Sequence, residues 1–286
     1  MTRISFEVFP ARTEAGERNL WQTLERLSPL EPAFVSVTCG AGGGSIDATL
    51  GVLERLTAAG RPPAAGHITC VGRSRTETDA QLERYWQAGV RHVVALRGDP
   101  PSGQERFAAH PDGYQSATDL VAGISAVHPF EISVAAYPEP HPESQSILHD
   151  LRVLAAKAQA GATRAITQFC FDTAAIVGLR DRIAAADIPL TLAPGILLAT
   201  DFQAVSRMAG RCGATLPPWL EARFAGLEDE PHARSLVGAI VAAAQVERLQ
   251  HEGFEEFHFY TLNQSDLALA VCRLLGAGAA PARSAA

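Results

Sequence analysis

The stretch EISVAAYPEPHPESQSILHDLRVLAAKAQA, residues 131–160, holds the pattern on which the fold assignment depends. It begins with a short apolar run at 131–137, which is typical of a buried β-strand. Across 144–160 apolar residues return at helical spacing, at Ile147, Leu148, Leu151, Leu154 and Ala155. A proline-rich segment separates the two parts. The stretch therefore predicts a strand, a stiff loop and an amphipathic helix in succession.

The same succession recurs on both sides of this stretch. Eight strands are predicted, at 4–9, 33–39, 64–71, 90–96, 131–137, 164–170, 189–193 and 256–261. Helical patterns lie between them, as in 78–88, where Leu82, Tyr85 and Trp86 share one face, and extra helices are expected within 201–252 before the last strand. Eight strands alternating with helices favour an α/β fold of the (β/α)8 TIM barrel type, with an open doubly wound sheet as the alternative.

Length and composition fit one such domain, over residues 1–276, followed by an Ala/Gly/Pro-rich tail at 277–286 that we expect to be disordered. The net charge of −7 and the absence of a Lys/Arg-rich block argue against nucleic acid and anionic membranes as partners. No apolar stretch is long enough to span a membrane, and strand-like sequence from Ile4 leaves no room for a signal peptide. Five scattered cysteines without a CxxC pair favour neither a metal site nor disulfides, so we expect a cytoplasmic protein with reduced thiols.

Polar residues gather at the predicted ends of the strands. The strand ends carry Glu7, Thr38, His67, Arg97-Gly98-Asp99, Tyr137 and Gln168, then Pro194-Gly195 and Tyr260. Active sites of (β/α)8 barrels lie where the strands end and in the loops that follow them. The distribution therefore predicts an enzyme with its site at this mouth of the barrel.

Glu7 is the least expected of these residues, because it interrupts the apolar strand ISFEVFP (4–10). Alternation along the strand places it on one face with Ser5 and Phe9. Burial raises the pKa of a carboxyl group, which would suit a general acid. The alternative is a structural ion pair with Arg12 or Arg97.

Three further segments allow both a functional and a structural interpretation. Asp99 in ALRGDP (95–100) could belong to the site or cap a turn. The glycines of CGAGGGS (39–45) could cradle a phosphate, but the acidic residue of a dinucleotide-binding motif is missing, which favours a flexible loop. His141 in YPEPHPE (137–143), like His67, could bind a ligand or serve as a structural hydrogen-bonding group.

Taken in order, these segments resemble the methylenetetrahydrofolate reductase family of the bacterial type. The matching motifs are SFEVFP (5–10), FVSVTCGAGG (34–43), HITC (67–70), HVVALRGDPP (92–101), ISVAAYPEPHPE (132–143), AGATRAITQFCFD (160–172), PGIL (194–197) and FHFYTLN (257–263). The resemblance implies a flavin-bearing (β/α)8 barrel in which NADH or NADPH reduces bound FAD. Reduction of 5,10-methylenetetrahydrofolate to 5-methyltetrahydrofolate then follows at the same site, in a ping-pong sequence that supplies methyl groups for methionine synthesis.

The resemblance also assigns roles to residues of this sequence. Glu7 falls on the family's proton donor, and Asp99 on the aspartate beside the flavin. The implied cofactor-binding positions are Thr38, Cys39, Ala41, His67, Arg97, Gly98, Asp99, Ala117, Tyr137, His141, Ser144, Asp150 and Lys157. The implied substrate positions are Gln168, Met208, Tyr260 and Gln264. No metal is implied, and relatives form dimers or tetramers, so a homo-oligomer is expected.

Several positions depart from the family pattern. Val153 and Ala156 stand where bacterial relatives usually have a polar and a basic residue, which leaves Lys157, with Arg152 as a possible substitute, to face the FAD diphosphate. Ser116 and Met208 replace aromatic residues, and Gln264 replaces an arginine. Two alternatives to the leading function follow: the same folate chemistry with a loosely bound flavin or a deazaflavin, or a non-catalytic folate- or flavin-binding paralogue.

Overall fold

The computed structural model describes residues 2–39, 45–60, 62–99 and 107–276 of the chain. Its strands form one all-parallel sheet in the order β7-β6-β5-β4-β3-β2-β1-β9-β8. The strands are β1 (Arg3–Val8), β2 (Val35–Val37), β3 (Ala64–Thr69), β4 (His92–Leu96), β5 (Glu131–Ala136), β6 (Arg164–Thr167), β7 (Thr191–Ala193), β8 (Gly195–Leu197) and β9 (Glu256–Tyr260).

The predicted barrel is confirmed, with one refinement in its seventh strand. This strand was expected at 189–193, but the structure divides it into β7 and β8, which are separated by Pro194 alone. Proline has no N–H to offer a sheet, so a ladder breaks where it stands. β7 pairs with β6 while β8 pairs with β9, so the bent strand joins the two ends of the sheet and closes the ring.

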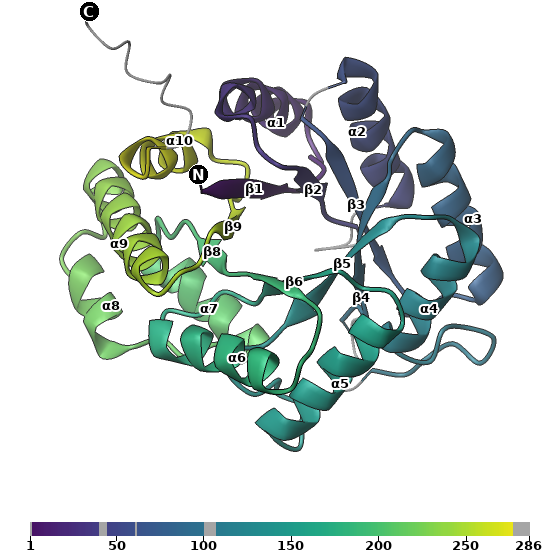
Figure 1. Ribbon diagram of the computed structural model, residues 1–286. Coiled ribbons are helices and arrows are strands. Elements are labelled where there is room, and N and C mark those ends of the chain that lie inside the picture. The colour runs from purple at the N-terminus through teal and green to yellow at the C-terminus, as the bar shows by residue number, and fades with distance from the viewer. Residues whose placement is uncertain (1, 40–44, 61, 100–106, 277–286) are drawn as a thin grey trace, which may run out of the picture.

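Helices surround this ring in chain order (Figure 1). They are α1 (Glu14–Leu27), α2 (Ile46–Ala59), α3 (Arg75–Gln87), α4 (Ala117–Val127), α5 (Ile147–Gln159), α6 (Thr173–Ala185), α7 (Phe202–Cys212), α8 (Pro218–Phe224), α9 (Pro231–His251) and α10 (Ser265–Leu274), with a short 3-10 turn, η1 (Ser28–Leu30). The extra helices expected before the last strand are α7, α8 and α9. In α5 the predicted apolar stripe is only partly buried, since Leu154 is covered while Leu148 remains 61% exposed.

Two apolar layers hold the barrel together. The larger lies between the sheet and the helices and includes Phe6, Val8 and Leu82, all fully buried. The smaller lies inside the ring, where Phe34, Ala65, Val94, Ile166 and Ala193 meet. Burying these side chains on both faces of the sheet is the main force that closes it.

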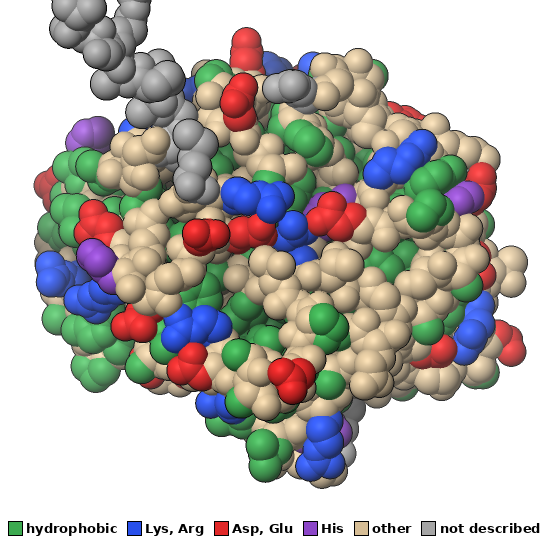
Figure 2. All heavy atoms as spheres, viewed as in Figure 1, with side chains coloured by type: hydrophobic (Ala, Val, Ile, Leu, Met, Phe, Trp, Pro, Cys, Tyr) green, Lys and Arg blue, Asp and Glu red, His purple; other side chains and the backbone are tan. Residues whose placement is uncertain are grey.

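Charged residues close the end of the barrel at which the strands begin. Arg164 on β6 pairs with Glu131 on β5, and its Nε lies 3.0 Å from a carboxylate oxygen of Glu256 on β9. Arg3 on β1 binds the other oxygen of Glu256 at 2.7 Å. Figure 2 shows acidic and basic side chains side by side near the middle of the molecule. This floor leaves the opposite end of the barrel to form a site.

Candidate active site

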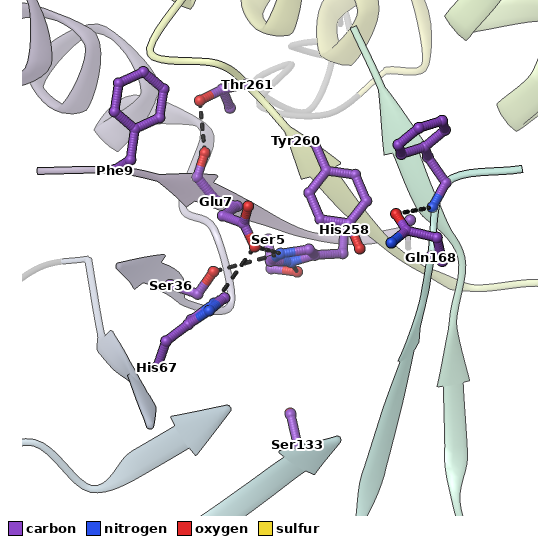
Figure 3. A network of polar contacts seen from close by, with 12 residues as sticks. Ser5, Glu7, Phe9, Ser36, His67, Ser133, Gln168, His258, Tyr260 and Thr261 are labelled. Carbon is purple, nitrogen blue, oxygen red and sulfur yellow. Dashed lines mark hydrogen bonds and ion pairs between the residues drawn. The ribbon is translucent and has the colours of Figure 1, made fainter. Parts of the chain in front are cut away.

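Glu7 lies inside the barrel near the end of β1. Its neighbours Phe6 and Val8 point outward and are fully buried against the helices. Ser5 and Glu7 therefore point inward, as the alternation of the strand predicted. The carboxylate meets two histidines, with Oε2 at 3.4 Å from His67 Nε2 and 3.9 Å from His258 Nε2 (Figure 3).

The alternative ion pair of Glu7 with an arginine is not formed. Arg97 instead binds Glu143 of the loop after β5, with 2.5 Å between Nη1 and Oε2. In the described part of the chain, the ionisable partners of Glu7 are the two histidines. Its side chain keeps 22% exposure toward the mouth of the barrel, so a ligand can reach it.

The expectation that burial would raise the pKa of Glu7 is wrong for the protein without ligand. Burial does act in that direction, but the electrostatic attraction of the nearby imidazoles of His258 and His67 outweighs it. The pKa of Glu7 is consequently lower than that of an ordinary glutamate. The ligand-free site therefore holds Glu7 as a carboxylate near pH 7.

His258 is a central residue of the site that the sequence analysis missed. Its Nδ1 lies 2.7 Å from Ser5 Oγ and its Nε2 lies 3.4 Å from Ser36 Oγ, which fixes the ring beneath Glu7. Phe34 stacks on the ring, with centroids 5.6 Å apart. The signal was available, because His258 precedes Tyr260 by two residues and must share its inward face.

His67 provides an unused polar atom beside Glu7. Its side chain is 7% exposed, and burial is the main reason that its pKa is below the ordinary value, so the ring is neutral near pH 7. Among the described residues, its Nε2 has no hydrogen-bond partner, because the 3.4 Å contact with Glu7 is not aligned as a hydrogen bond. A buried polar atom without a partner is costly, and a bound ligand can satisfy it.

Tyr260 and Gln168 form another wall of the mouth (Figure 3). The Tyr260 hydroxyl donates to the carbonyl oxygen of Thr167 at 2.7 Å, which ties β9 to the end of β6. Burial raises the pKa of this hydroxyl well above its ordinary value, so it stays protonated. Gln168 follows Thr167, and its Oε1 accepts a hydrogen bond from the Phe169 amide at 3.0 Å. The predicted substrate residues Gln168 and Tyr260 are thus brought together.

Cationic and aromatic groups gather beyond the ends of β4 and β5. Lys157 of α5 is buried, its Nζ donates to the Ala135 carbonyl oxygen at 3.0 Å, and burial lowers its pKa to about 8. Asp150 lies about two turns earlier on the same helix, and it accepts a hydrogen bond from the backbone N–H of His141 at 3.1 Å. The rings of Tyr137 and His141 meet edge to face at 4.7 Å.

The family-model comparison covers residues 1–276 with the model described as "Methylenetetrahydrofolate reductase". The chain belongs to the methylenetetrahydrofolate reductase family. It is 44% identical to "5,10-methylenetetrahydrofolate reductase" of Pectobacterium carotovorum subsp. carotovorum, over 96% of this chain and 90% of the relative. The protein of that name from Escherichia coli strain K12 is 43% identical with the same coverage. The resemblance seen in the sequence motifs is confirmed.

The fold is shared with more distant structures. One is an "Uncharacterized protein from Clostridium thermocellum" that "binds two copies of 5-methyl-5,6,7,8-tetrahydrofolic acid", with a TM-score of 0.62 and 13% identity over 97% of this chain and 95% of that one. At that identity the similarity concerns the fold alone. No helix among the described residues is long and apolar enough to cross a membrane. Nor do those residues bring together three or more side chains able to hold a metal ion.

The other described residues that were predicted to bind the cofactor follow the ends of β2, β4 and β5 or begin α4. Thr38 is buried just after β2, where its carbonyl oxygen accepts from Thr49 Oγ1 at 2.9 Å. Cys39 is half-buried beside it, Gly98 follows β4 with a φ of 86°, and Asp99 is exposed. Ala117 begins α4, and the Ser144 amide donates to the His141 carbonyl oxygen at 2.7 Å. Ala41 and the glycines at 40 and 42–44 lie outside the described residues.

Two of the residues expected to depart from the family pattern have local structural roles. Ser116 caps α4, because its hydroxyl accepts from the Asp119 amide at 3.1 Å. Met208 on α7 packs against a separate apolar cluster that includes Phe169, Leu197 and Tyr260. Gln264 is exposed at the N-terminal cap position of α10, close in sequence to Tyr260. α7 therefore extends the wall that begins at Gln168 and Tyr260.

Proposed function

We propose that this protein reduces 5,10-methylenetetrahydrofolate to 5-methyltetrahydrofolate, with NADH or NADPH as reductant and FAD as the bound carrier, and so supplies methyl groups for methionine synthesis. The observation that carries the proposal is Glu7, held between two histidines at the barrel mouth of a chain belonging to the methylenetetrahydrofolate reductase family. The relatives named above supply the substrate that this site would take.

Glu7 would donate the proton on which the reaction depends. The five-membered ring of the substrate must open to an electrophilic iminium, and opening requires a proton on the departing nitrogen. A folate lying over the mouth removes the water that reaches the 22% exposed side chain. Loss of that water raises the pKa of a carboxyl group. Ligand binding would thus turn the carboxylate of the free protein into the acid that the chemistry needs.

The residues present fit a flavin nucleotide. FAD, when bound, supplies hydride transfer between the nicotinamide and the folate. Lys157 and Arg97 provide positive charge for a diphosphate, although Arg97 is paired with Glu143 in the free protein. His67 Nε2 offers an unsatisfied polar atom, and the positive φ of Gly98 lets the backbone approach a ligand closely. Asp99 would place a negative charge where it can stabilise the cationic iminium.

The folate would lie against the opposite wall. Gln168 offers an amide for hydrogen bonds, while Tyr260 and Met208 offer apolar surface. Gln264 stands where relatives usually have an arginine, so this chain would hold the acidic tail of the substrate with a neutral amide. Thr38, Cys39, Ala41, Ala117, Tyr137, His141, Ser144 and Asp150 complete the proposed flavin site.

The test is the visible absorption spectrum of purified protein, before and after anaerobic NADH and then methylenetetrahydrofolate. We expect flavin bands that bleach with NADH and return with the folate. A colourless protein that becomes active only with another flavin or a deazaflavin would replace FAD in the proposal. A protein that binds folate or flavin, yet neither oxidises NADH or NADPH nor reduces the folate, would overturn the reductase assignment in favour of a non-catalytic paralogue.

We also propose that the protein is a cytoplasmic homo-oligomer, a dimer or a tetramer. Supporting observations are the exposed apolar side chains of Leu236 and Ile240, one turn apart on α9, which keep 59% and 60% exposure in the single chain. Light scattering after gel filtration measures the assembly, and a monomer at micromolar concentration would contradict it. Cell fractionation tests the location.

A further inference from the structure

The turn between β9 and α10 has a costly backbone conformation. Leu262 and Asn263 both adopt left-handed conformations, with φ of 50° and 55°. Side chains other than glycine avoid this region, and two successive residues in it persist only where surrounding contacts hold them. The turn follows Tyr260 directly and lies at the mouth of the barrel. Contacts from β1 and α1 hold it in place.

The side chain of Asn263 forms the hydrogen bonds that a neighbouring strand would otherwise form with Phe9. The ladder between β1 and β9 has its last pair at Glu7 and Tyr260. Beyond that pair, Asn263 Oδ1 accepts from the Phe9 backbone N–H at 3.0 Å, and its Nδ2 donates to the Phe9 carbonyl oxygen at 2.9 Å. One amide side chain thus satisfies both backbone groups of Phe9, as a paired strand would. It holds the chain two residues past Glu7.

A second set of contacts joins this bridge to Glu7 and to α1. Thr261 Oγ1 donates to the Glu7 carbonyl oxygen at 2.7 Å (Figure 3) and accepts from the Asn263 N–H at 3.2 Å. The carbonyl oxygen of Asn263 accepts from Asn19 Nδ2 at 2.7 Å and from Thr23 Oγ1 at 3.0 Å, both on α1. Asn263 is 4% exposed, so these bonds are shielded from water.

We propose that Asn263 is a positioning residue for Glu7. Its side chain clamps Phe9, and its backbone N–H orients the Thr261 hydroxyl that holds the Glu7 carbonyl, so the carboxylate is fixed toward the departing nitrogen. The inference rests on the proposed function, in which Glu7 acts only when the folate ring opens. Reduction by NADH breaks no carbon–nitrogen bond and needs no proton from Glu7. Loss of the Asn263 side chain should therefore slow the reduction of the folate and leave the reduction of FAD by NADH unchanged.

The experiment compares Asn263→Gly with Asn263→Ala in FAD-loaded protein. Both variants remove the side-chain hydrogen bonds to Phe9. Glycine tolerates the left-handed backbone and alanine does not, so the comparison separates loss of these hydrogen bonds from backbone strain, and the glycine variant is the less prone to misfold. Asn19→Ala is the matched control, because it removes one hydrogen bond to Asn263 and leaves both bonds to Phe9. Stopped-flow absorbance gives the rate of bleaching by NADH and the rate of recovery with methylenetetrahydrofolate. Hydrogen exchange of residues 7–9 reports the bridge directly.

We expect both Asn263 variants to slow the folate half-reaction about tenfold or more, with NADH reduction within about threefold of wild type. Exchange protection of Phe9 should fall in both variants and persist in Asn19→Ala. An Asn263→Gly protein with wild-type folate kinetics would overturn the proposal, as would equal losses in both half-reactions. If wild type itself fails to reduce the folate, the proposed function fails instead, and the exchange data still decide whether the bridge exists.

Discussion

At the scale of single residues, the site is defined by which neighbours each ionisable group has. Glu7 and Lys157 are both buried, yet they are stabilised differently. Two histidines face Glu7 and lower its pKa, whereas the charge of Lys157 is opposed by burial, which lowers its pKa to about 8. Both groups would change their protonation equilibrium when a ligand covers them. pH dependence is therefore the natural measurement at this scale.

Replacing His258 by glutamine should raise the pKa of Glu7. The imidazole of His258, 3.9 Å from the carboxylate, lowers that pKa, and without it the opposing effect of burial gains weight. We expect the pH profile of the folate half-reaction to move upward. His92→Gln is the control, because His92 bonds Ser133 at 2.8 Å and lies on the floor side of the interior. Equal shifts of the pH profile in His258→Gln and His92→Gln would contradict the assignment of His258 as the residue that lowers the pKa of Glu7.

FAD affinity should decrease as the pH rises above about 8, the pKa of Lys157. Above that value the lysine of the free protein is neutral, and binding to the diphosphate must first take up a proton. The affinity should then fall by up to about tenfold per pH unit. Titration of apoprotein by flavin fluorescence measures this effect. Lys157→Met should bind weakly without the pH dependence, while Arg152→Met, at an exposed position on the same helix, should keep it.

At the scale of secondary-structure elements, close contacts decide where glycine is needed. Gly238 lies in α9 where an added Cβ would stand 1.9 Å from the Ala199 carbonyl oxygen, just after β8. Gly51 lies in α2 with nothing within 4 Å of such an atom. Both glycines are equally unfavourable for an isolated helix. Their tertiary surroundings differ, because only α9 is pressed against the barrel at its glycine.

Gly238→Ala should therefore lower the free energy of unfolding by about 2 kcal/mol through overpacking. Gly51→Ala should raise it by about 0.5–1 kcal/mol, because alanine reduces the freedom of the unfolded chain. Urea unfolding of the two variants beside wild type measures both values. Effects of the same sign would show that α9 can move away from Ala199 without loss.

At the scale of the whole molecule, the two ends of the barrel have different tasks. Four strands contribute the charged floor of Arg3, Glu131, Arg164 and Glu256, and Arg164 lies over the ring of Phe34 at 5.4 Å. The opposite end carries His67 Nε2, a buried polar atom that has no hydrogen-bond partner among the described residues. The ion pairs that stabilise the fold thus lie where the strands begin and the candidate active site lies where they end, as is general in (β/α)8 barrels.

Arg164→Met should destabilise the fold by about 2 kcal/mol at pH 7, because two carboxylates lose a buried partner. Glu131 keeps 48% side-chain exposure, which limits the loss. Its pKa is below the ordinary value in the folded protein, so its contribution is present above about pH 4.3 and is lost as the pH falls further. The variant should therefore lose less stability than wild type on acidification. Arg84→Met, which breaks an exposed pair with Asp47, should change stability by less than about 0.5 kcal/mol.

Much of the fold could be predicted from local sequence. Strand and helix periodicity located every strand except β8, and the positions of Glu7, Gln168 and Tyr260 at strand ends placed them in the site. β8 was missed because Pro194 interrupts the run, and only pairing with β9 shows that Gly195–Leu197 continues the sheet. The Gly-rich loop at 40–44 and the tail at 277–286 lie outside the described residues, so those predictions stay predictions.

Residue order and spacing were enough to establish the alternation of strands and helices, the inward face of β1 and the family. The tertiary structure alone decided that Glu7 meets His67 and His258, that Arg97 pairs with Glu143, and that Asn263 completes β1. Partners from distant strands meet only when the ring closes. The pKa of Glu7 depends on those partners through distances of a few ångströms, and such distances are set by packing.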